Sequence, residues 1–314
     1  MKSSIIVHPD EFSKGWIDKA VRAGIGAIGI HPVGGNLAAQ SLESLLRQTK
    51  TPEFRRLIDY AHEQGLIVEY EFHAMGYLLP RDLFETHPEY FRMQRNGERT
   101  VKYNFCPSNE EAMSLVAERS VQVATELYGS SHDFYFWLDD GRDLHCKCPR
   151  CRHLSASDQQ MMVLNRMLRA IKTRIPDARM AYLAYIDSIV PPTKVRAERG
   201  VFLEYAPFEK YTAKGDSAAK LIAHEKEMIA PLMNAFSGEP RKVLEYWYDN
   251  SLYSRWTKPP KEFVLRENEM RREIREYKDM GFDCISTFAC YLGEDYQVLY
   301  GDVDVTPFAN ALFE

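Results

Sequence analysis

Two adjacent acidic residues and a group of cysteines stand close together near the middle of this chain. Asp139 and Asp140 follow the apolar run 133–138, which is typical of a buried strand. Two neighbouring carboxylates can push their pKa values apart, which leaves one charged and one protonated near neutral pH. Such a pair suits a general acid beside a charge-stabilising group. The structural alternative is a polar strand end in which one aspartate caps the next loop.

Four of the six cysteines are expected to gather beside these aspartates. They are Cys106, Cys146, Cys148 and Cys151, and the last three form a Cys-x-Cys-x2-Cys run. Four thiolates make a closed tetrahedral zinc site, which braces loops and leaves no open position for catalysis. We therefore expect a structural Zn²⁺ and no organic cofactor. Disulfides or free thiols are the alternatives, and His145 and His153 are substitute ligands.

Further polar and aromatic residues lie at expected strand ends. Glu204 and Glu245 are each predicted to point into a binding site, as a clamp on a sugar hydroxyl or as a nucleophile, with a structural salt bridge as the alternative. His31 and His73 are predicted substrate contacts, or else buried core histidines. The aromatic residues predicted to stack on a sugar are Trp247, Tyr248, Tyr253, Trp256 and Tyr291.

Short apolar runs alternate with amphipathic stretches along the whole chain. The predicted strands are 4–7, 27–31, 67–73, 134–139, 180–185, 201–205, 243–247 and 284–290. The predicted helices are 11–23, 41–64 with a break near Pro52, 109–128 with Ser108 as N-cap, 155–174, 213–236 and 261–280. Only a short connection is expected after the fifth strand.

Eight strand–helix repeats in 314 residues favour a closed (β/α)8 TIM barrel, in the α/β class, as a single domain over 1–314. An open doubly wound sheet is disfavoured, because no Gly-x-Gly-x-x-Gly follows the first strand. We expect a long loop insertion at about 74–106 and a Cys-rich loop at 141–153. Catalytic groups of such barrels lie at the carboxyl ends of the strands, where Asp139 and Asp140 are placed.

Composition narrows the classes of partner. A net charge of −5 and a pI near 6.0 argue against nucleic-acid binding. No apolar run approaches the roughly 18 residues of a membrane span. The amino-terminal residues lack the apolar core of a signal peptide, so a cytoplasmic location is expected unless a signal peptide was removed. The oligomeric state is left open.

The residues Asp140-Gly141, the cysteine run and the upstream segment 105–109 carry a family resemblance, clearest over residues 100–185. The chain resembles a bacterial family of uncharacterised glycoside-hydrolase-like barrel domains, some of whose relatives are endo-β-N-acetylglucosaminidases acting on N-glycans. Relatives often carry an extra amino-terminal domain, which we do not expect here. The four-cysteine pattern is similar to the zinc site of one β-galactosidase family. The Asp-Asp pair looks like that of the O-GlcNAc-hydrolase family, which implies that Asp139 orients an acetamido group and Asp140 is the general acid.

The predicted function is therefore a glycoside hydrolase acting on an oligosaccharide or glycoside. The first mechanism is substrate-assisted and retaining, on a 2-acetamido sugar. The second is a two-carboxylate mechanism with Asp140 as acid and Glu245 or Glu204 as nucleophile or base. The third possibility is a non-catalytic carbohydrate-binding barrel.

Overall fold

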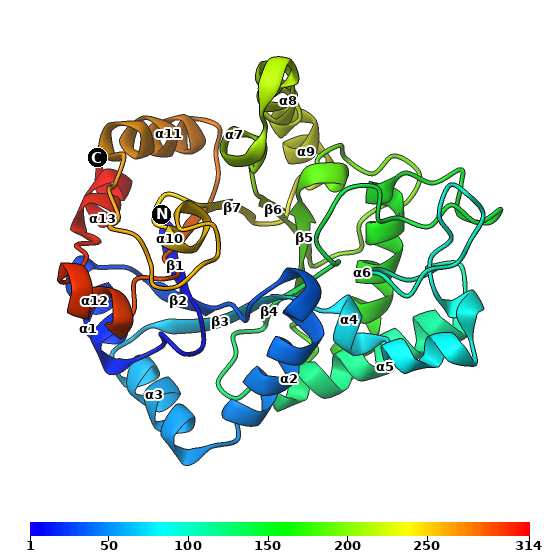
Figure 1. Ribbon diagram of the computed structural model, residues 1–314, viewed down its shortest axis with the longest axis horizontal. Helices are drawn as coiled ribbons and strands as arrows, with labels where there is room; N and C mark the ends of the chain where they lie inside the picture. The colour runs from blue at the N-terminus through cyan, green and yellow to red at the C-terminus, as the bar shows by residue number, and fades with distance from the viewer.

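The computed structural model describes residues 1–314 and contains a closed barrel of eight parallel strands in sequential order (Figure 1). The strands are β1 Lys2–Val7, β2 Ala27–Ile30, β3 Ile67–His73, β4 Asp133–Trp137, β5 Arg179–Ala184, β6 Val201–Tyr205, β7 Arg241–Glu245 and β8 Cys284–Phe288. Each strand pairs in parallel with the next, and β8 closes the ring on β1. The predicted single-domain (β/α)8 barrel is confirmed.

Helices surround the barrel. The α-helices are α1 Lys14–Ala23, α2 Ala38–Gln48, α3 Pro52–Glu63, α4 Met75–Leu78, α5 Glu110–Glu126, α6 Ala156–Lys172, α7 Glu209–Thr212, α8 Ala218–Glu227, α9 Ile229–Ala235, α10 Asn250–Tyr253, α11 Glu267–Asp279, α12 Glu294–Tyr300 and α13 Thr306–Phe313. Short 3-10 turns are η1 Gly35–Leu37, η2 Arg81–Glu85, η3 Pro88–Tyr90, η4 Ile186–Ser188 and η5 Gly215–Ser217. None of these helices is both long and apolar enough to cross a membrane.

Several helix boundaries differ from the sequence-based ones, for local reasons. The break expected near Pro52 is confirmed, because Thr51 caps α3 by accepting the Phe54 N–H at 3.3 Å and Pro52 begins the new helix, whereas α2 begins at Ala38 instead of residue 41. The N-cap of α5 is Asn109, whose Oδ1 accepts the Ala112 N–H at 2.9 Å, and not Ser108. The helix expected over 213–236 is divided into α8 and α9, and the one over 261–280 begins only at Glu267.

The connection after β5 contains no α-helix, as expected. Hydrogen bonds to a residue of α6 hold this connection in place. One carboxylate oxygen of Asp158 accepts the backbone N–H groups of Thr193, Lys194 and Val195 at 2.9, 2.7 and 3.1 Å. These bonds lower the pKa of Asp158 despite its burial. The β5–β6 connection is therefore ordered against the barrel wall without a helix of its own.

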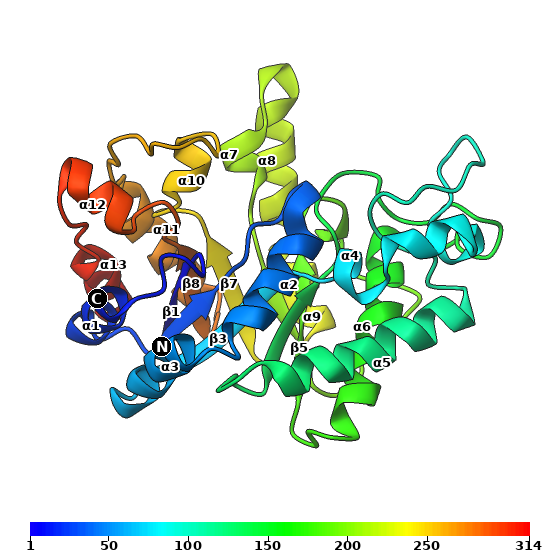
Figure 2. The same ribbon diagram turned by 60° about the horizontal axis from the view of Figure 1, so that its bottom comes forward.

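The insertion after β3 and the Cys-rich loop after β4 form a side lobe, defined here as residues 74–106 and 141–153. In Figures 1 and 2 these cyan and green segments lie side by side at the right, over α5 and α6. The Lys147 N–H donates to the Met93 carbonyl at 2.8 Å, which joins the two segments. The insertion is not one long loop, because it contains α4, η2 and η3.

The barrel interior below its mouth holds a buried charge cluster, defined here as Glu69, Glu71, Tyr135, Glu204 and Lys242. The Lys242 ammonium lies 2.6 Å from Glu71, 3.2 Å from Glu69 and 3.5 Å from Glu204. Burial raises the pKa of Glu71 well above its usual range, although Lys242 opposes the shift. A carboxyl whose pKa is raised by burial stays protonated at a pH where an exposed carboxyl is ionised. This is why three carboxyl groups can surround one ammonium here.

Glu204 belongs to this cluster and not to the mouth. Its side chain is fully buried and accepts the Trp137 Nε1–H at 2.7 Å. Because Trp137 lies nearer the carboxyl end of the barrel, Glu204 is covered from above. The prediction that Glu204 points into the mouth is corrected accordingly.

Candidate active site

The loops at the carboxyl ends of the strands carry all the strained backbone of this chain outside glycine. The residues with positive φ are Asp143, Ile186, Arg255, Trp256 and Tyr291, and each follows β4, β5, β7 or β8. Figure 2 shows α7, α10 and α12, which belong to the same set of loops, along the upper edge of the molecule. Such strain clusters at functional sites and binding loops. The mouth that these loops surround is the candidate site.

Asp139 stands at the mouth between β3 and β4. Its Oδ2 pairs with Arg81 at 2.9 Å, and its Oδ1 accepts a long 3.4 Å bond from the Gly76 N–H. The Asp139 backbone N–H donates to Asn104 at 2.7 Å, so the insertion fixes the position of this residue. Burial raises the pKa of Asp139, while the Arg81 charge opposes the shift.

Asp140 has a different environment from its neighbour. It is partly buried and lies beside Tyr185, which follows β5, and near Tyr246, which follows β7. Burial first, and then the neighbouring charges that include Asp140, raise the pKa of both tyrosines well above the usual range. The two adjacent aspartates thus have different surroundings, with Asp139 held in an ion pair and Asp140 beside tyrosine hydroxyl groups.

A third carboxylate, Asp249, reaches the mouth from the loop after β7 and was missed by the sequence reasoning. Its Oδ1 caps α10 by accepting the N–H groups of Ser251 and Leu252 at 3.0 and 3.2 Å. Burial raises its pKa, and the hydrogen bonds from Ser251 and Leu252 oppose the shift. Both Asp140 and Asp249 contribute to the raised pKa of Tyr246, so the two carboxylates lie near the same hydroxyl. The available signal was an acidic residue just after a strand.

Glu245 does not face the mouth, which corrects its predicted placement. Its carboxylate accepts hydrogen bonds from Lys210 at 2.7 Å, Tyr211 at 2.9 Å and Tyr277 at 2.5 Å, and these residues belong to α7 and α11 outside the barrel. Successive residues of a strand point to opposite faces, and in β7 the inward positions belong to Lys242 and Leu244, so Glu245 points outward. Glu245 ties the barrel wall to its helices.

Trp247 and Tyr248 are also turned away from the mouth, contrary to prediction. The Trp247 Nε1–H donates to Glu273 on α11 at 2.7 Å. Tyr248 is fully buried, and its hydroxyl donates to the Asp304 carbonyl at 3.2 Å. Both rings pack in the apolar layer between the strands and the outer helices, where a sugar has no access.

The other predicted aromatic residues remain at the rim. Tyr253 and Trp256 are 55% and 61% exposed on the loop after β7. Tyr291 is half-buried, and its ring meets the His8 ring edge-on at a centroid distance of 5.9 Å. Of the aromatic residues predicted to stack on a sugar, three therefore lie at the rim of the mouth, and Trp247 and Tyr248 lie in the interior.

Histidines line the mouth beside β1, β2 and β3. His31 and His73 are both 8% exposed, and each packs against Trp137 at centroid distances of 5.6 and 5.3 Å. His8, the third, is 7% exposed and stacks on His31 at 5.9 Å. Burial and the two neighbouring histidines lower the pKa of His31 well below the usual range, so this ring is neutral at pH 7.

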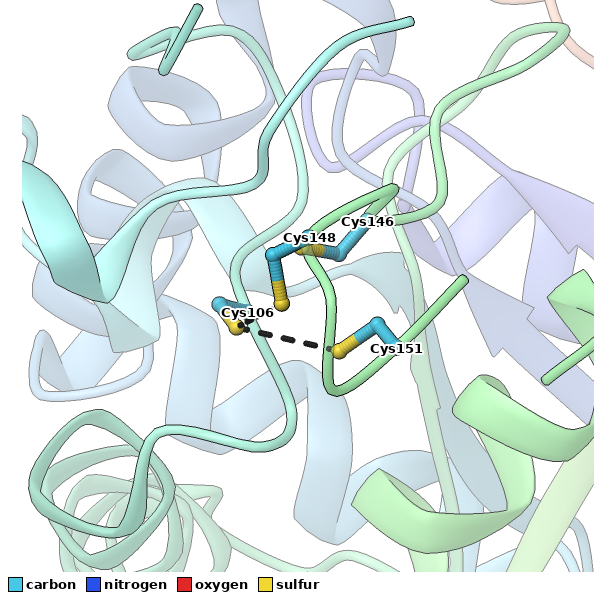
Figure 3. Close-up of side chains that lie close together, drawn as sticks. All are labelled: Cys106, Cys146, Cys148 and Cys151. Atoms are coloured by element: carbon cyan, nitrogen blue, oxygen red, sulfur yellow. Dashed lines mark hydrogen bonds between the residues drawn. The ribbon is translucent and has the colours of Figure 1, made fainter. Parts of the chain in front are cut away.

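The four cysteines of the side lobe come together, as expected (Figure 3). The Cys106 sulfur lies 3.6 Å from that of Cys148 and 3.8 Å from that of Cys151, and no disulfide forms. Tetrahedral zinc with Zn–S bonds of about 2.3 Å places its sulfurs about 3.8 Å apart. The Met93 N–H donates to the Cys146 sulfur at 3.3 Å, as backbone groups around metal-bound thiolates do. The residues fit a closed tetrahedral metal site.

A small cavity of about 50 Å³ lies between this side lobe and the mouth. Asp139, Leu144, His145, Tyr185 and Asp187 contribute to its lining. The Cys-rich loop therefore forms one wall of the space next to Asp139. A brace on this loop would act directly on the shape of the candidate site.

Solved structures with the same fold are glycoside hydrolases at very low identity. Cel5A from Thermotoga maritima, solved with cellobiose, is 11% identical with a TM-score of 0.55, covering 99% of this chain and 96% of its own. Endo-glycoceramidase II from Rhodococcus sp. is 9% identical with a TM-score of 0.58, covering 99% and 78%. A β-galactosidase from the psychrophilic Marinomonas ef1 is 10% identical with a TM-score of 0.58. The match covers all of this chain and 59% of the β-galactosidase chain. At such identities the likeness shows the fold alone.

None of the curated proteins matches this chain. Residues 43–229 match a family model described as a domain of unknown function, DUF4838. The match spans β3, β4, both aspartates and all four clustered cysteines. Because it covers more than half of the sequence, it shows that the chain belongs to the DUF4838 family.

Proposed function

We propose that this protein is a glycoside hydrolase in which Asp140 is the general acid. The observation that carries the proposal is the contrast between two adjacent aspartates at the mouth. Asp139 is buried and paired with Arg81 at 2.9 Å, whereas Asp140 lies beside the Tyr185 and Tyr246 side chains. Carboxyls in different environments take the different roles of acid and charge stabiliser. The barrel shape shared with glycoside hydrolases agrees with this assignment.

The preferred mechanism is substrate-assisted and acts on a 2-acetamido sugar. Asp140 protonates the leaving oxygen while the acetamido oxygen attacks the anomeric carbon. Asp139 accepts the acetamido N–H and stabilises the positive charge that develops on this group. Its Oδ1 accepts only the 3.4 Å bond from Gly76 and so retains a lone pair for the substrate.

A two-carboxylate mechanism is the second candidate, and the geometry favours Asp249 over Glu245 and Glu204 as the partner of Asp140. Asp249 reaches the mouth from the side opposite β4, whereas Glu245 is bonded to α7 and α11 and Glu204 is sealed inside the barrel. In this mechanism Asp249 is the nucleophile or the base, and the separation of the two carboxyls decides between retention and inversion.

We also propose that Cys106, Cys146, Cys148 and Cys151 bind one structural Zn²⁺. The sulfur–sulfur distances of 3.6 and 3.8 Å and the burial of all four thiols support the assignment. When bound, zinc supplies cross-links among the segments of the side lobe. The side lobe in turn positions Asp139, through the Asn104 and Arg81 contacts.

A panel of chromogenic aryl glycosides tests the proposed activity. We expect turnover of an aryl 2-acetamido glycoside and inhibition by a thiazoline analogue of N-acetylglucosamine. A 2-fluoro glycoside separates the mechanisms, because it traps a glycosyl-enzyme only when a protein carboxylate is the nucleophile. A labelled Asp249 peptide would establish the two-carboxylate mechanism. Binding without turnover of any aryl glycoside would instead identify a carbohydrate-binding barrel.

A further inference from the structure

Three histidines on consecutive strands repeat one hydrogen-bonding pattern. The Nδ1 atom of His8 bonds to the His31 carbonyl at 2.7 Å, and that of His31 bonds to the Glu71 carbonyl at 2.7 Å. The Nδ1 atom of His73 bonds to the Leu138 carbonyl at 2.6 Å. Each ring therefore bonds to the backbone of the next strand around the barrel. The His8 and His31 rings are stacked at 28° and the His73 ring stands at 79° to that of His31, yet each ring keeps Nε2 free of a partner in the chain.

This pattern determines which nitrogen carries the proton. A carbonyl oxygen only accepts hydrogen bonds, so Nδ1 of each ring must donate. In a neutral imidazole the other nitrogen, Nε2, is then an acceptor. None of the three Nε2 atoms has a partner within the chain, and none is sealed from solvent, although the three residues are more than nine-tenths buried. The mouth thus presents three unused acceptors along β1, β2 and β3.

We infer that this histidine row, His8, His31 and His73, binds hydroxyl groups of an uncharged sugar unit. Hydroxyls are the donors that a sugar ring offers, and neutral Nε2 atoms accept from them. The inference deepens the proposed function by specifying the face of the substrate that β1 to β3 contact. It assigns hydroxyl recognition to the ends of β1 to β3, next to the reacting aspartates that follow β4.

The charges around the row argue against an anionic sugar. Carboxylates lie beside the row: Glu11 accepts the His8 N–H at 3.2 Å, and Asp139 directly follows Leu138, whose carbonyl accepts from His73. The cation Arg81 is already paired with Asp139. Lys258 lies 4.9 Å above the Tyr291 ring but pairs with Asp295 at 2.7 Å. A carboxylate or sulfate group would meet net negative charge here.

The row also lacks the geometry of a metal site. His8 and His31 are stacked with an interplanar angle of 28°, and the His31 and His73 centroids are 6.4 Å apart. Nitrogen ligands must converge to about 2.1 Å from one zinc ion. Rings spread over the ends of three strands can contact several groups of one ligand instead of surrounding a single ion.

Histidine-¹⁵N NMR tests the inference without catalysis. We expect Nδ1-protonated, Nε2-unprotonated rings at pH 7.5 for all three residues. Methyl glycosides of neutral sugars, with and without a 2-acetamido group, should shift the three Nε2 resonances. The matching methyl uronides should bind at least about tenfold more weakly. Nε2-protonated rings, tighter uronide binding, or a stoichiometric Zn²⁺ site on these nitrogens would each overturn the inference.

Gly34→Ala is a probe that leaves the histidines in place. An added Cβ would lie 3.1 Å from His73 Cδ2 and 3.7 Å from its Nε2, and the Gly34 backbone at φ −84° accepts alanine. We expect binding of the neutral methyl glycoside about tenfold weaker. His73→Asn, whose amide can still donate towards the Leu138 carbonyl, should show a similar loss. Gly26→Ala, with no atom nearer than 3.8 Å to the added Cβ, is the matched control and should bind like the original chain.

The outcomes also separate this inference from the proposed function. Aryl-glycoside turnover with unchanged binding in Gly34→Ala and His73→Asn would reject the histidine row alone. Glycoside-induced Nε2 shifts in a protein without turnover would reject the hydrolase assignment alone.

Discussion

The buried charge cluster inside the barrel and the mouth above it are both rich in polar side chains, yet they differ in how many polar atoms are hydrogen-bonded within the chain. In the cluster, Lys242 contacts three carboxylates, while Trp137 and Tyr135 donate to Glu204 and Glu69 at 2.7 and 3.0 Å. In the mouth, one nitrogen of each histidine is bonded and the other is free. Polar groups that the fold pairs internally serve stability, whereas those left free at a concave surface serve a ligand.

The comparison also separates two carboxylates that look equivalent in the sequence. Glu245 and Asp249 both lie at or just after the end of β7. Glu245 accepts three hydrogen bonds from α7 and α11, while Asp249 bonds only to its own loop and leaves one oxygen for the mouth. Substituting Glu245 should therefore lower stability more than activity. Substituting Asp249 should lower activity more than stability.

The largest expected effect on stability is at Lys242. Lys242→Met leaves three buried carboxylates without their cation and should cost about 3–5 kcal/mol in the free energy of unfolding. Urea denaturation measures the loss. Lys14→Met removes the exposed Lys14–Asp18 pair and should cost far less, because solvent screens exposed ion pairs. Equal losses in the two variants would mean that the cluster is not a structural centre.

Loss of the metal site should act on the side lobe. The original chain should contain about one zinc per molecule by elemental analysis. Cys146→Ser should lose most of this zinc and become sensitive to proteolysis within residues 74–106 and 141–153, while the intrinsic chemical step changes less than stability. Cys290→Ser, whose thiol lies in the barrel, should keep its zinc. A Cys106–Cys146 disulfide in metal-free protein would exclude the zinc site.

Glu245→Gln and Asp249→Asn sharpen the difference between the two carboxylates. Glu245→Gln should cost about 1–3 kcal/mol in stability, because an uncharged amide replaces the carboxylate that accepts hydrogen bonds from Lys210 and two tyrosines. It should leave kcat nearly unchanged. Asp249→Asn should lower turnover with little change in stability. Urea denaturation and steady-state kinetics measure the two effects. A larger loss of turnover in Glu245→Gln than in Asp249→Asn would place Glu245 in the site.

The pH dependence of stability is a smaller effect, expected from Glu71. Burial raises its folded pKa well above the unfolded value of about 4.3, so between these values the native state holds a proton that the unfolded state has lost. Stability therefore falls as pH rises through this window, by up to about 1.4 kcal/mol per pH unit for this group. Glu71→Gln should flatten the fall in Tm between pH 5 and 8, and an unchanged slope would contradict the assignment.

Local patterns predicted the barrel and the clustering of four cysteines. Apolar runs, caps and spacing encode these features within short segments. The facing of Glu204 and Glu245 was not predictable, because it depends on where each strand begins and on its register with its neighbours. His31 and His73 were predicted as substrate contacts, but their arrangement in a row with His8 was not predictable, for the same reason. Its bonds join His8 to β2, His31 to β3 and His73 to the chain just after β4, and no single segment shows them.

The most direct test of the account is the leaving-group dependence of Asp140→Asn. We predict a fall in turnover of about 10²–10⁴-fold for aryl glycosides with poor leaving groups, because an amide cannot supply the proton. Glycosides with strongly acidic leaving groups need no proton and should lose much less. Urea denaturation should show stability close to that of the original chain, since Asp140 is only partly buried at the mouth. Equal losses for both kinds of substrate would contradict Asp140 as the general acid, and unaltered turnover would remove it from the active site.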